Sequence, residues 1–144
     1  MKFRTLFLAG VTALSFGAAT LPAQAGGSVY LEQRGGWNEF GGGQHGTRNR
    51  ITVDQRGRAN GGFATQRGWR NHTVIGQQGR GNYADTDQRG GRNIVGIAQF
   101  GRGHTAITSQ DGNGNAIGVI QAGRGNTAHA RQIGRGNVSV IVQD

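Results

Sequence analysis

The sequence predicts an all-β fold, a β-solenoid of about five 22-residue coils that each run strand, turn, strand, turn and stack into cross-β amyloid. Three observations lead to this prediction. Glutamine recurs at every eleventh residue, the residues before each glutamine alternate with a period of two, and the bulk of the alternating side chains changes from one repeat to the next. A repeat of fixed length that persists along a chain indicates a stacked repeat architecture.

The eleven-residue repeat is marked by three residue types at constant spacing. Glutamine occupies Gln33, Gln44, Gln55, Gln66, Gln77, Gln88, Gln99, Gln110, Gln121, Gln132 and Gln143. Glycine follows two residues after each of the first ten, at Gly35, Gly46, Gly57, Gly68, Gly79, Gly90, Gly101, Gly112, Gly123 and Gly134. Asparagine follows five residues after, at Asn38, Asn49, Asn60, Asn71, Asn82, Asn93, Asn115, Asn126 and Asn137, and His104 replaces it once.

Each repeat is predicted to be one strand and one turn. In residues 115–121, Asn115, Ile117, Val119 and Gln121 share one face, which is the pattern of a β-strand with one buried side. The next four residues, 122–125, are predicted to form a tight turn in which glycine supplies positive φ. Counting from residues 29–33, the chain contains eleven such strands, or five and a half coils.

The inward-facing pairs show that two repeats make one coil. Alternate strands carry mostly large pairs: Ile51/Val53, Thr73/Ile75, Val95/Ile97, Ile117/Val119 and Ser139/Ile141. The strands between them carry mostly small pairs: Phe40/Gly42, Gly62/Ala64, Ala84/Thr86, Ala106/Thr108 and Ala128/Ala130. We therefore expect two sheets that close on a thin core, large side chains against small ones.

In the predicted stack, each residue lies above the equivalent residue of the preceding coil. At a rise of about 4.8 Å per coil, the stack is about 26 Å long, and each glutamine and asparagine lies over its counterpart in the preceding coil. We expect their amides to hydrogen-bond along the stack as ladders, each bond contributing about 1 kcal/mol.

Residues 1–25 have the pattern of a bacterial secretory signal peptide. Lys2 and Arg4 precede an apolar run at residues 6–16, and Ala23-Gln24-Ala25 forms a small-residue cleavage site. The apolar run is too short for a membrane anchor. The mature part is expected to be one repeat domain, residues 26–144, whose first repeat, 27–44, is degenerate. It has no cysteine, so its order must come from hydrogen bonds and packing.

The last predicted strand, residues 137–143, is uncharged, and Val138, Val140 and Val142 make its outward side apolar as well. Only Asp144 follows it. Such a strand is a template for another chain. We therefore expect end-to-end polymerisation into a cross-β fibre, with self as the principal partner.

The motif Gln-x-Gly-x-x-Asn-x-Ala-x-x-x-Gln, which occurs literally at residues 121–132, resembles the curlin repeat of curli amyloid subunits. The resemblance implies export through an outer-membrane channel with accessory proteins in a Gram-negative bacterium. It also implies nucleation at the cell surface by a nucleator subunit, and extracellular, pilus-like fibres for adhesion, aggregation and biofilm matrix. The regular last repeat is more similar to that of the major subunit, and the nucleator is the alternative. Only Gly26-Gly27-Ser28 stands where the family has a longer leader.

The turns are rich in arginine, and the formal net charge is +9. Arg80, Arg102 and Arg124 should form a line with one arginine per coil. That line is either a device for solubility or an anion ridge that binds matrix polyanions such as polysaccharide or DNA. A soluble basic solenoid that binds polyanions without polymerising is therefore a further alternative.

No constellation of residues predicts catalysis, a metal site or a cofactor. Asp85 and Asp87 share an outward face, where we expect them to slow premature assembly as charged gatekeepers. The four histidines, His45, His72, His104 and His129, occupy positions that do not stack, and the glycine-rich turns have no phosphate-loop lysine. Trp37 and Trp69 are expected in turns, where they could stack on sugars or be ordinary surface aromatics.

Overall fold

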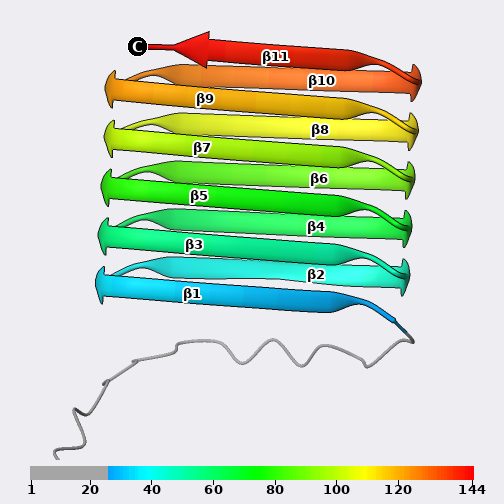
Figure 1. The fold of residues 1–144 in the computed structure, drawn as a ribbon, viewed down its shortest axis with the longest axis horizontal. Helices are drawn as coiled ribbons and strands as arrows, with labels where there is room; N and C mark the ends of the chain where they lie inside the picture. The colour runs from blue at the N-terminus through cyan, green and yellow to red at the C-terminus, as the bar shows by residue number, and fades with distance from the viewer. Residues whose placement is uncertain (1–25) are drawn as a thin grey trace, which may run out of the picture.

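The computed structural model describes residues 26–144, so the predicted signal peptide lies outside the described residues. The described chain forms eleven strands joined by very short connections (Figure 1). The strands are β1 Ser28–Gly36, β2 Glu39–Thr47, β3 Arg50–Arg58, β4 Gly61–Trp69, β5 His72–Arg80, β6 Tyr83–Gly91, β7 Ile94–Arg102, β8 Thr105–Asn113, β9 Ala116–Arg124, β10 Thr127–Arg135 and β11 Val138–Gln143. Within residues 26–144 there is no helix that could cross a membrane.

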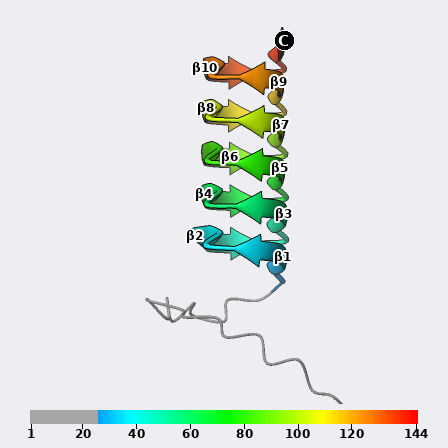
Figure 2. The same cartoon turned by 90° about the vertical axis from the view of Figure 1, so that its left-hand side faces the viewer.

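The strands alternate between two parallel sheets that face each other (Figure 2). The six-stranded sheet has the order β1-β3-β5-β7-β9-β11, and the five-stranded sheet has the order β10-β8-β6-β4-β2. Neighbouring strands pair in a register of one coil, so that Gln55 lies opposite Gln77 and Gln77 opposite Gln99. This arrangement confirms the predicted β-solenoid of about five 22-residue coils.

The core is thin and consists of large side chains from one sheet and small ones from the other. The six-stranded sheet contributes Ile51, Val53, Ile75, Val95, Ile97, Ile117 and Val119. The five-stranded sheet contributes Ala64, Ala84, Ala106, Ala128 and Ala130. Phe40, the one large residue among the small inward pairs, packs against this cluster from β2. The size alternation read from the sequence is therefore the packing rule of the core.

The strands are longer, and the turns shorter, than predicted. We expected a strand over residues 115–121 and a turn over 122–125, but β9 extends over Ala116–Arg124 and only Gly125 and Asn126 lie between strands. The reason is that turn residues also lie over their counterparts, as Arg102 lies over Arg124, so backbone hydrogen bonds continue around the bend.

The bend requires two residues with positive φ. The first is the glycine two residues after each glutamine; at Gly101, φ is +132° and a β-carbon would overlap the carbonyl oxygen of Gly123 in the next coil. The second lies two residues later and is not always glycine. Arg48, for example, has φ of 56° there, and the equivalent Gly114 has φ of 67°. Close backbone approach therefore excludes a side chain only at the first of the two positions.

Candidate functional site

The inward glutamines form two uninterrupted chains of side-chain hydrogen bonds. In the six-stranded sheet, Gln77 Nε2 donates to Gln99 Oε1 at 2.8 Å, and Gln99 Nε2 donates to Gln121 Oε1 at 2.9 Å. The column continues at both ends, from Gln33 through Gln55 and on to Gln143. The five-stranded sheet has an equivalent column through Gln44, Gln66, Gln88, Gln110 and Gln132. Every amide donates toward the C-terminal end of the stack, which gives both columns a direction.

Every glutamine of the six-stranded column except Gln33 also donates a hydrogen bond to the facing sheet. The same Nε2 group of Gln99 donates to the backbone carbonyl of Tyr83 in the facing strand at 2.9 Å. Gln77 makes the equivalent bond to Gly61, and Gln55 to Glu39. A buried amide must have partners for its donors and acceptor, and these bonds supply them both along and across the stack.

The asparagines form two columns, one at each edge of the stack, and both work differently from the expected amide-to-amide ladder. Asn71 Oδ1 accepts the backbone N–H of Asn93 at 3.1 Å, and Asn93 Nδ2 donates to the carbonyls of Arg89 and Gly112, both at 2.9 Å. Asparagine is one methylene shorter than glutamine and lies at the bend, where its amide reaches backbone groups. Direct bonds between asparagine amides join only three pairs, Asn38–Asn60, Asn93–Asn115 and Asn115–Asn137.

His104 takes the asparagine position and reproduces its bonding. Its Nδ1 accepts the backbone N–H of Asn126 at 3.2 Å, and its Nε2 lies 3.2 Å from the carbonyl oxygen of Phe100. A ring that accepts at Nδ1 and donates at Nε2 is a neutral imidazole. The side chain is fully buried, so this histidine is a structural member of one asparagine column.

The predicted arginine line exists and is longer than expected. Arg80, Arg102 and Arg124 are in register at the ends of β5, β7 and β9, and Arg58 at the end of β3 precedes them. The same 22-residue spacing in the sequence could have identified Arg58. We call these four exposed residues the odd-strand ridge. The ion pairs within residues 26–144 use Arg34, Arg56 and Arg89, so none of them neutralises this ridge.

The two acidic residues singled out from the sequence lie on the outer face of β6. Asp85 lies between Phe63 and Ile107 of the adjoining strands, so it places a carboxylate between two apolar side chains of the outer face. Partial burial raises the pKa of Asp85, and the neighbouring Asp87 raises that pKa further. Asp87 contacts Arg89 through one carboxylate oxygen, and its other oxygen is buried without a partner. The pair lies on a sheet face without a facing carboxylate across a cleft, which is the wrong geometry for glycosidase chemistry.

The other histidines are in unrelated positions. In the strand register, His45 lies opposite Arg67, and His129 lies opposite Ile107. His72 lies between Arg50 and Ile94 of the two neighbouring strands. Burial, and then the charge of Arg50, lowers the pKa of His72. In the described part of the chain, no group of three or more histidine or acidic side chains is placed to hold a metal ion.

Comparison with known proteins agrees with the repeat. The family model of the curlin associated repeat matches residues 46–79 and again residues 79–112. Each match runs from one turn glycine to another three repeats later, Gly46 to Gly79 and Gly79 to Gly112. No curated protein matches the chain.

One solved structure with local similarity is a crystal structure of the polySia specific acetyltransferase NeuO, at 15% sequence identity and a TM-score of 0.28. The alignment covers 78% of this chain and spans about half, 51%, of that chain. The two matches to the repeat model, the 22-residue coils and the paired amide columns together place the protein: the chain belongs to the curlin-repeat family.

Proposed function

We propose that the chain is a secreted structural subunit that polymerises end to end into extracellular curli-like amyloid fibres. The observation that carries the proposal is the pair of directional glutamine columns, in which each interior glutamine both accepts from the coil before it and donates to the coil after it. The curlin-repeat match supports it, since that family consists of curli fibre subunits.

The physical argument concerns what a second copy would find at either end of the stack. Within the described residues, β1 and β11 bound the six-stranded sheet and β2 and β10 bound the five-stranded sheet. The outward side of β11 is apolar and open, with Val138 74%, Val140 68% and Val142 66% exposed. A parallel edge strand whose partner spacing and side-chain columns match those of another copy is a template for that copy.

The setting of the fibre follows from the family and from the signal-like segment at residues 1–25. We infer export to the surface of a Gram-negative bacterium through an outer-membrane channel with its accessory proteins, nucleation by a separate subunit, and a role in adhesion, aggregation and biofilm matrix. The regular register that continues through β11 favours the major fibre subunit over the nucleator.

Polymerisation is tested by diluting residues 26–144 from denaturant and following the protein by electron microscopy and dye binding. We expect unbranched fibres, and we expect Gln77→Ala with Gln99→Ala to delay or abolish them. The double substitution Gln78→Ala with Phe100→Ala, at the adjacent register positions outside the column, is the matched control. A persistently monomeric product from the unmodified chain would contradict the proposal.

A second function, polyanion binding, is favoured by the odd-strand ridge. Arginines spaced about 4.8 Å apart repel one another by about 1 kcal/mol per neighbouring pair even in water. Bound anions would relieve this repulsion. We expect binding to heparin or DNA that weakens steeply with salt, and a smaller salt dependence after Arg80→Gln, Arg102→Gln and Arg124→Gln. Binding that does not respond to salt would exclude a role for the ridge.

A further inference from the structure

The strands of the two sheets end at opposite edges of the stack (Figure 1). A second arginine column lies at the edge where the strands of the five-stranded sheet end. Arg48, Arg70 and Arg92 follow β2, β4 and β6 in three successive coils, and all three are exposed. Their φ angles are 56°, 55° and 57°, in the left-handed region that favours glycine. The equivalent positions in the other coils are glycine: Gly26, Gly114 and Gly136. Three arginines are therefore kept where the backbone would be more relaxed with glycine, which is the kind of local strain found at functional sites.

Trp69, the last residue of β4, lies beside this column of arginines. The ring centre is 5.6 Å from the guanidinium carbon of Arg70 and 4.7 Å from that of Arg92. Gly91 is its register partner in the next coil, and a β-carbon at Gly91 would overlap the indole. The ring is thus seated over a glycine and flanked by two cations, with 40% of its surface still exposed. We call Arg48, Trp69, Arg70 and Arg92 the even-strand edge.

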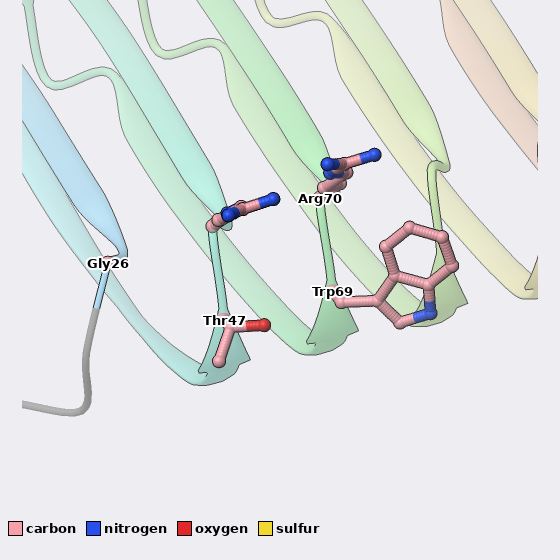
Figure 3. Close-up of a pocket in the computed structure, with 5 residues that line it drawn as sticks. Gly26, Thr47, Trp69 and Arg70 are labelled. Atoms are coloured by element: carbon pink, nitrogen blue, oxygen red, sulfur yellow. The ribbon is translucent and has the colours of Figure 1, made fainter.

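The even-strand edge borders a hollow. An open depression of about 610 Å³ is lined by Gly26, which precedes β1, and by Thr47, Arg48, Trp69 and Arg70 of the first two coils (Figure 3). A second depression of about 380 Å³ shares Gly26, Arg48 and Arg70, and its further lining residues are Ser28, Asn49, Arg50, Asn71 and His72. None of the ion pairs within residues 26–144 involves Arg48, Arg50, Arg70 or Arg92. The hollow therefore combines uncompensated positive charge with one fixed aromatic surface.

We propose that the even-strand edge binds an acidic polysaccharide, with sugar carboxylates on Arg48 and Arg70 and a sugar ring against the exposed part of Trp69. Guanidinium groups bind carboxylates through two parallel hydrogen bonds, and an aromatic ring offers an apolar surface to the C–H groups of a pyranose. One arginine per coil, at about 4.8 Å, is comparable with the length that one sugar residue adds to an extended chain.

Single-stranded nucleic acid fits the edge less well. Proteins that bind it use a run of aromatic platforms for successive bases. Here the register neighbours of Trp69 are Thr47 and Gly91, so the edge offers one platform only. The site begins beside Gly26 at the first coil and continues along the edge of the next coils. It is separate from the odd-strand ridge, which lies where the strands of the other sheet end.

The strain at these arginines provides a variant that removes binding without harming the fold. The triple substitution Arg48→Gly, Arg70→Gly and Arg92→Gly places glycine at three left-handed positions, so the coils should form at least as readily as in the unmodified chain. The matched control, Arg80→Gln with Arg102→Gln and Arg124→Gln, removes the same charge from the odd-strand ridge. Trp69→Ala tests the aromatic surface at unchanged charge.

Binding is measured with oligogalacturonate of defined length, by fluorescence of Trp69 or, for Trp69→Ala, by calorimetry. A Trp37→Phe background leaves Trp69 as the one tryptophan. We expect the triple glycine variant and Trp69→Ala to bind about tenfold more weakly or worse, and the odd-strand control to stay within about threefold of the unmodified chain. Neutral dextran should not bind. Circular dichroism verifies the fold of each variant.

Three outcomes would overturn the proposal. Equal losses in the triple glycine variant and the odd-strand control would show that net charge alone attracts the ligand. Unchanged affinity after Trp69→Ala would remove the aromatic contribution. Tighter, Trp69-dependent binding of oligo-dT than of an oligogalacturonate of equal charge would make the site one for nucleic acid. Fibre formation is followed in the same samples, so failure of this site is distinguishable from failure of polymerisation.

Discussion

The turns in the N-terminal half of the stack and those in the C-terminal half have the same backbone shape but different residues at the second positive-φ position. The first four turns use Trp37, Arg48, Ala59 and Arg70, and the last four use Gly103, Gly114, Gly125 and Gly136. Between them, Gly81 and Arg92 mark the change. A non-glycine residue in the left-handed region costs about 1–2 kcal/mol. The N-terminal turns are therefore the more strained ones.

The difference separates two tasks that the repeat performs. Inside the stack, both halves have the same glutamine columns and the same alternation of large and small side chains, and these determine the fold. At the edges, the N-terminal half gives up backbone relaxation and gains arginine and tryptophan side chains on the surface. We infer that the C-terminal coils are the easier ones to form, whereas the N-terminal coils have more of the binding chemistry.

The largest effect should come from a position that both halves share. Gly101→Ala forces a β-carbon against the carbonyl oxygen of Gly123, so the spacing between coils must open, and we expect a loss of about 4 kcal/mol in the free energy of unfolding. Gly103→Ala meets no atom within 4 Å and has only the cost of its φ, about 1 kcal/mol. Guanidinium titrations followed by circular dichroism measure both, and equal losses would contradict the close-approach argument.

The next largest effect should come from the glutamine column in an interior coil. Gln99→Ala leaves Gln77 Nε2, Gln121 Oε1 and the Tyr83 carbonyl each without this partner, and we expect a loss of about 3 kcal/mol. Gln33→Ala removes a single bond from an exposed side chain and should cost about 1 kcal/mol or less. The same guanidinium titration measures both variants. An unchanged free energy of unfolding in Gln99→Ala would show that the glutamine column does not stabilise the fold.

Exchanging residues between the two kinds of turn tests the comparison itself. Gly103→Arg should lower the unfolding free energy by about 1 kcal/mol, because it introduces the cost of a side chain in the left-handed region. Arg48→Gly should raise the unfolding free energy by up to about 1 kcal/mol, because it removes that cost at an arginine that, unlike Arg92, does not lie over Trp69. Native-state hydrogen exchange locates the change in the coil that carries each substitution. Shifts of the same sign for both variants would show that turn strain does not distinguish the halves.

The smallest effect concerns the acidic interruption on β6. The pKa of Asp85 is raised in the folded chain, so the folded state binds the proton more tightly, and stability should fall as pH rises from 3.8 through the folded pKa. Asp85→Asn should flatten that dependence. In a dye-binding assay at neutral pH, Asp85→Val with Asp87→Val should shorten the assembly lag if the pair acts as gatekeepers. An unchanged or longer lag would argue against that role.

The parts of the fold that follow from side-chain periodicity could be read from the sequence, and the parts that depend on coil-to-coil contact could not. The inward faces of residues such as Ile117 and Gln121 are set by the period of two. Side-chain periodicity places the strand ends too early, because hydrogen bonding along the stack continues through Gly123 and Arg124. Asn93 has the expected place, but a residue type does not reveal that its amide bonds to backbone groups.

The even-strand edge was the least predictable feature. The 22-residue spacing of Arg48, Arg70 and Arg92 is present in the sequence, as is the spacing between Trp69 and Gly91. The left-handed φ at each arginine and the seat of the indole over a glycine depend on the geometry of the bend, which periodicity does not contain.

The most direct measurement mixes two preparations of residues 26–144 before assembly, one with ¹⁵N in the glutamine side chains and one with ¹³C at the glutamine δ-carbon. Solid-state NMR then detects contacts between glutamines of different copies only. We predict ¹⁵N–¹³C cross-peaks between side-chain amides, because the column that joins Gln121 to Gln143 should continue into the next copy. Fibres that give no such cross-peaks would contradict the claim that stacked amides hold the copies in register.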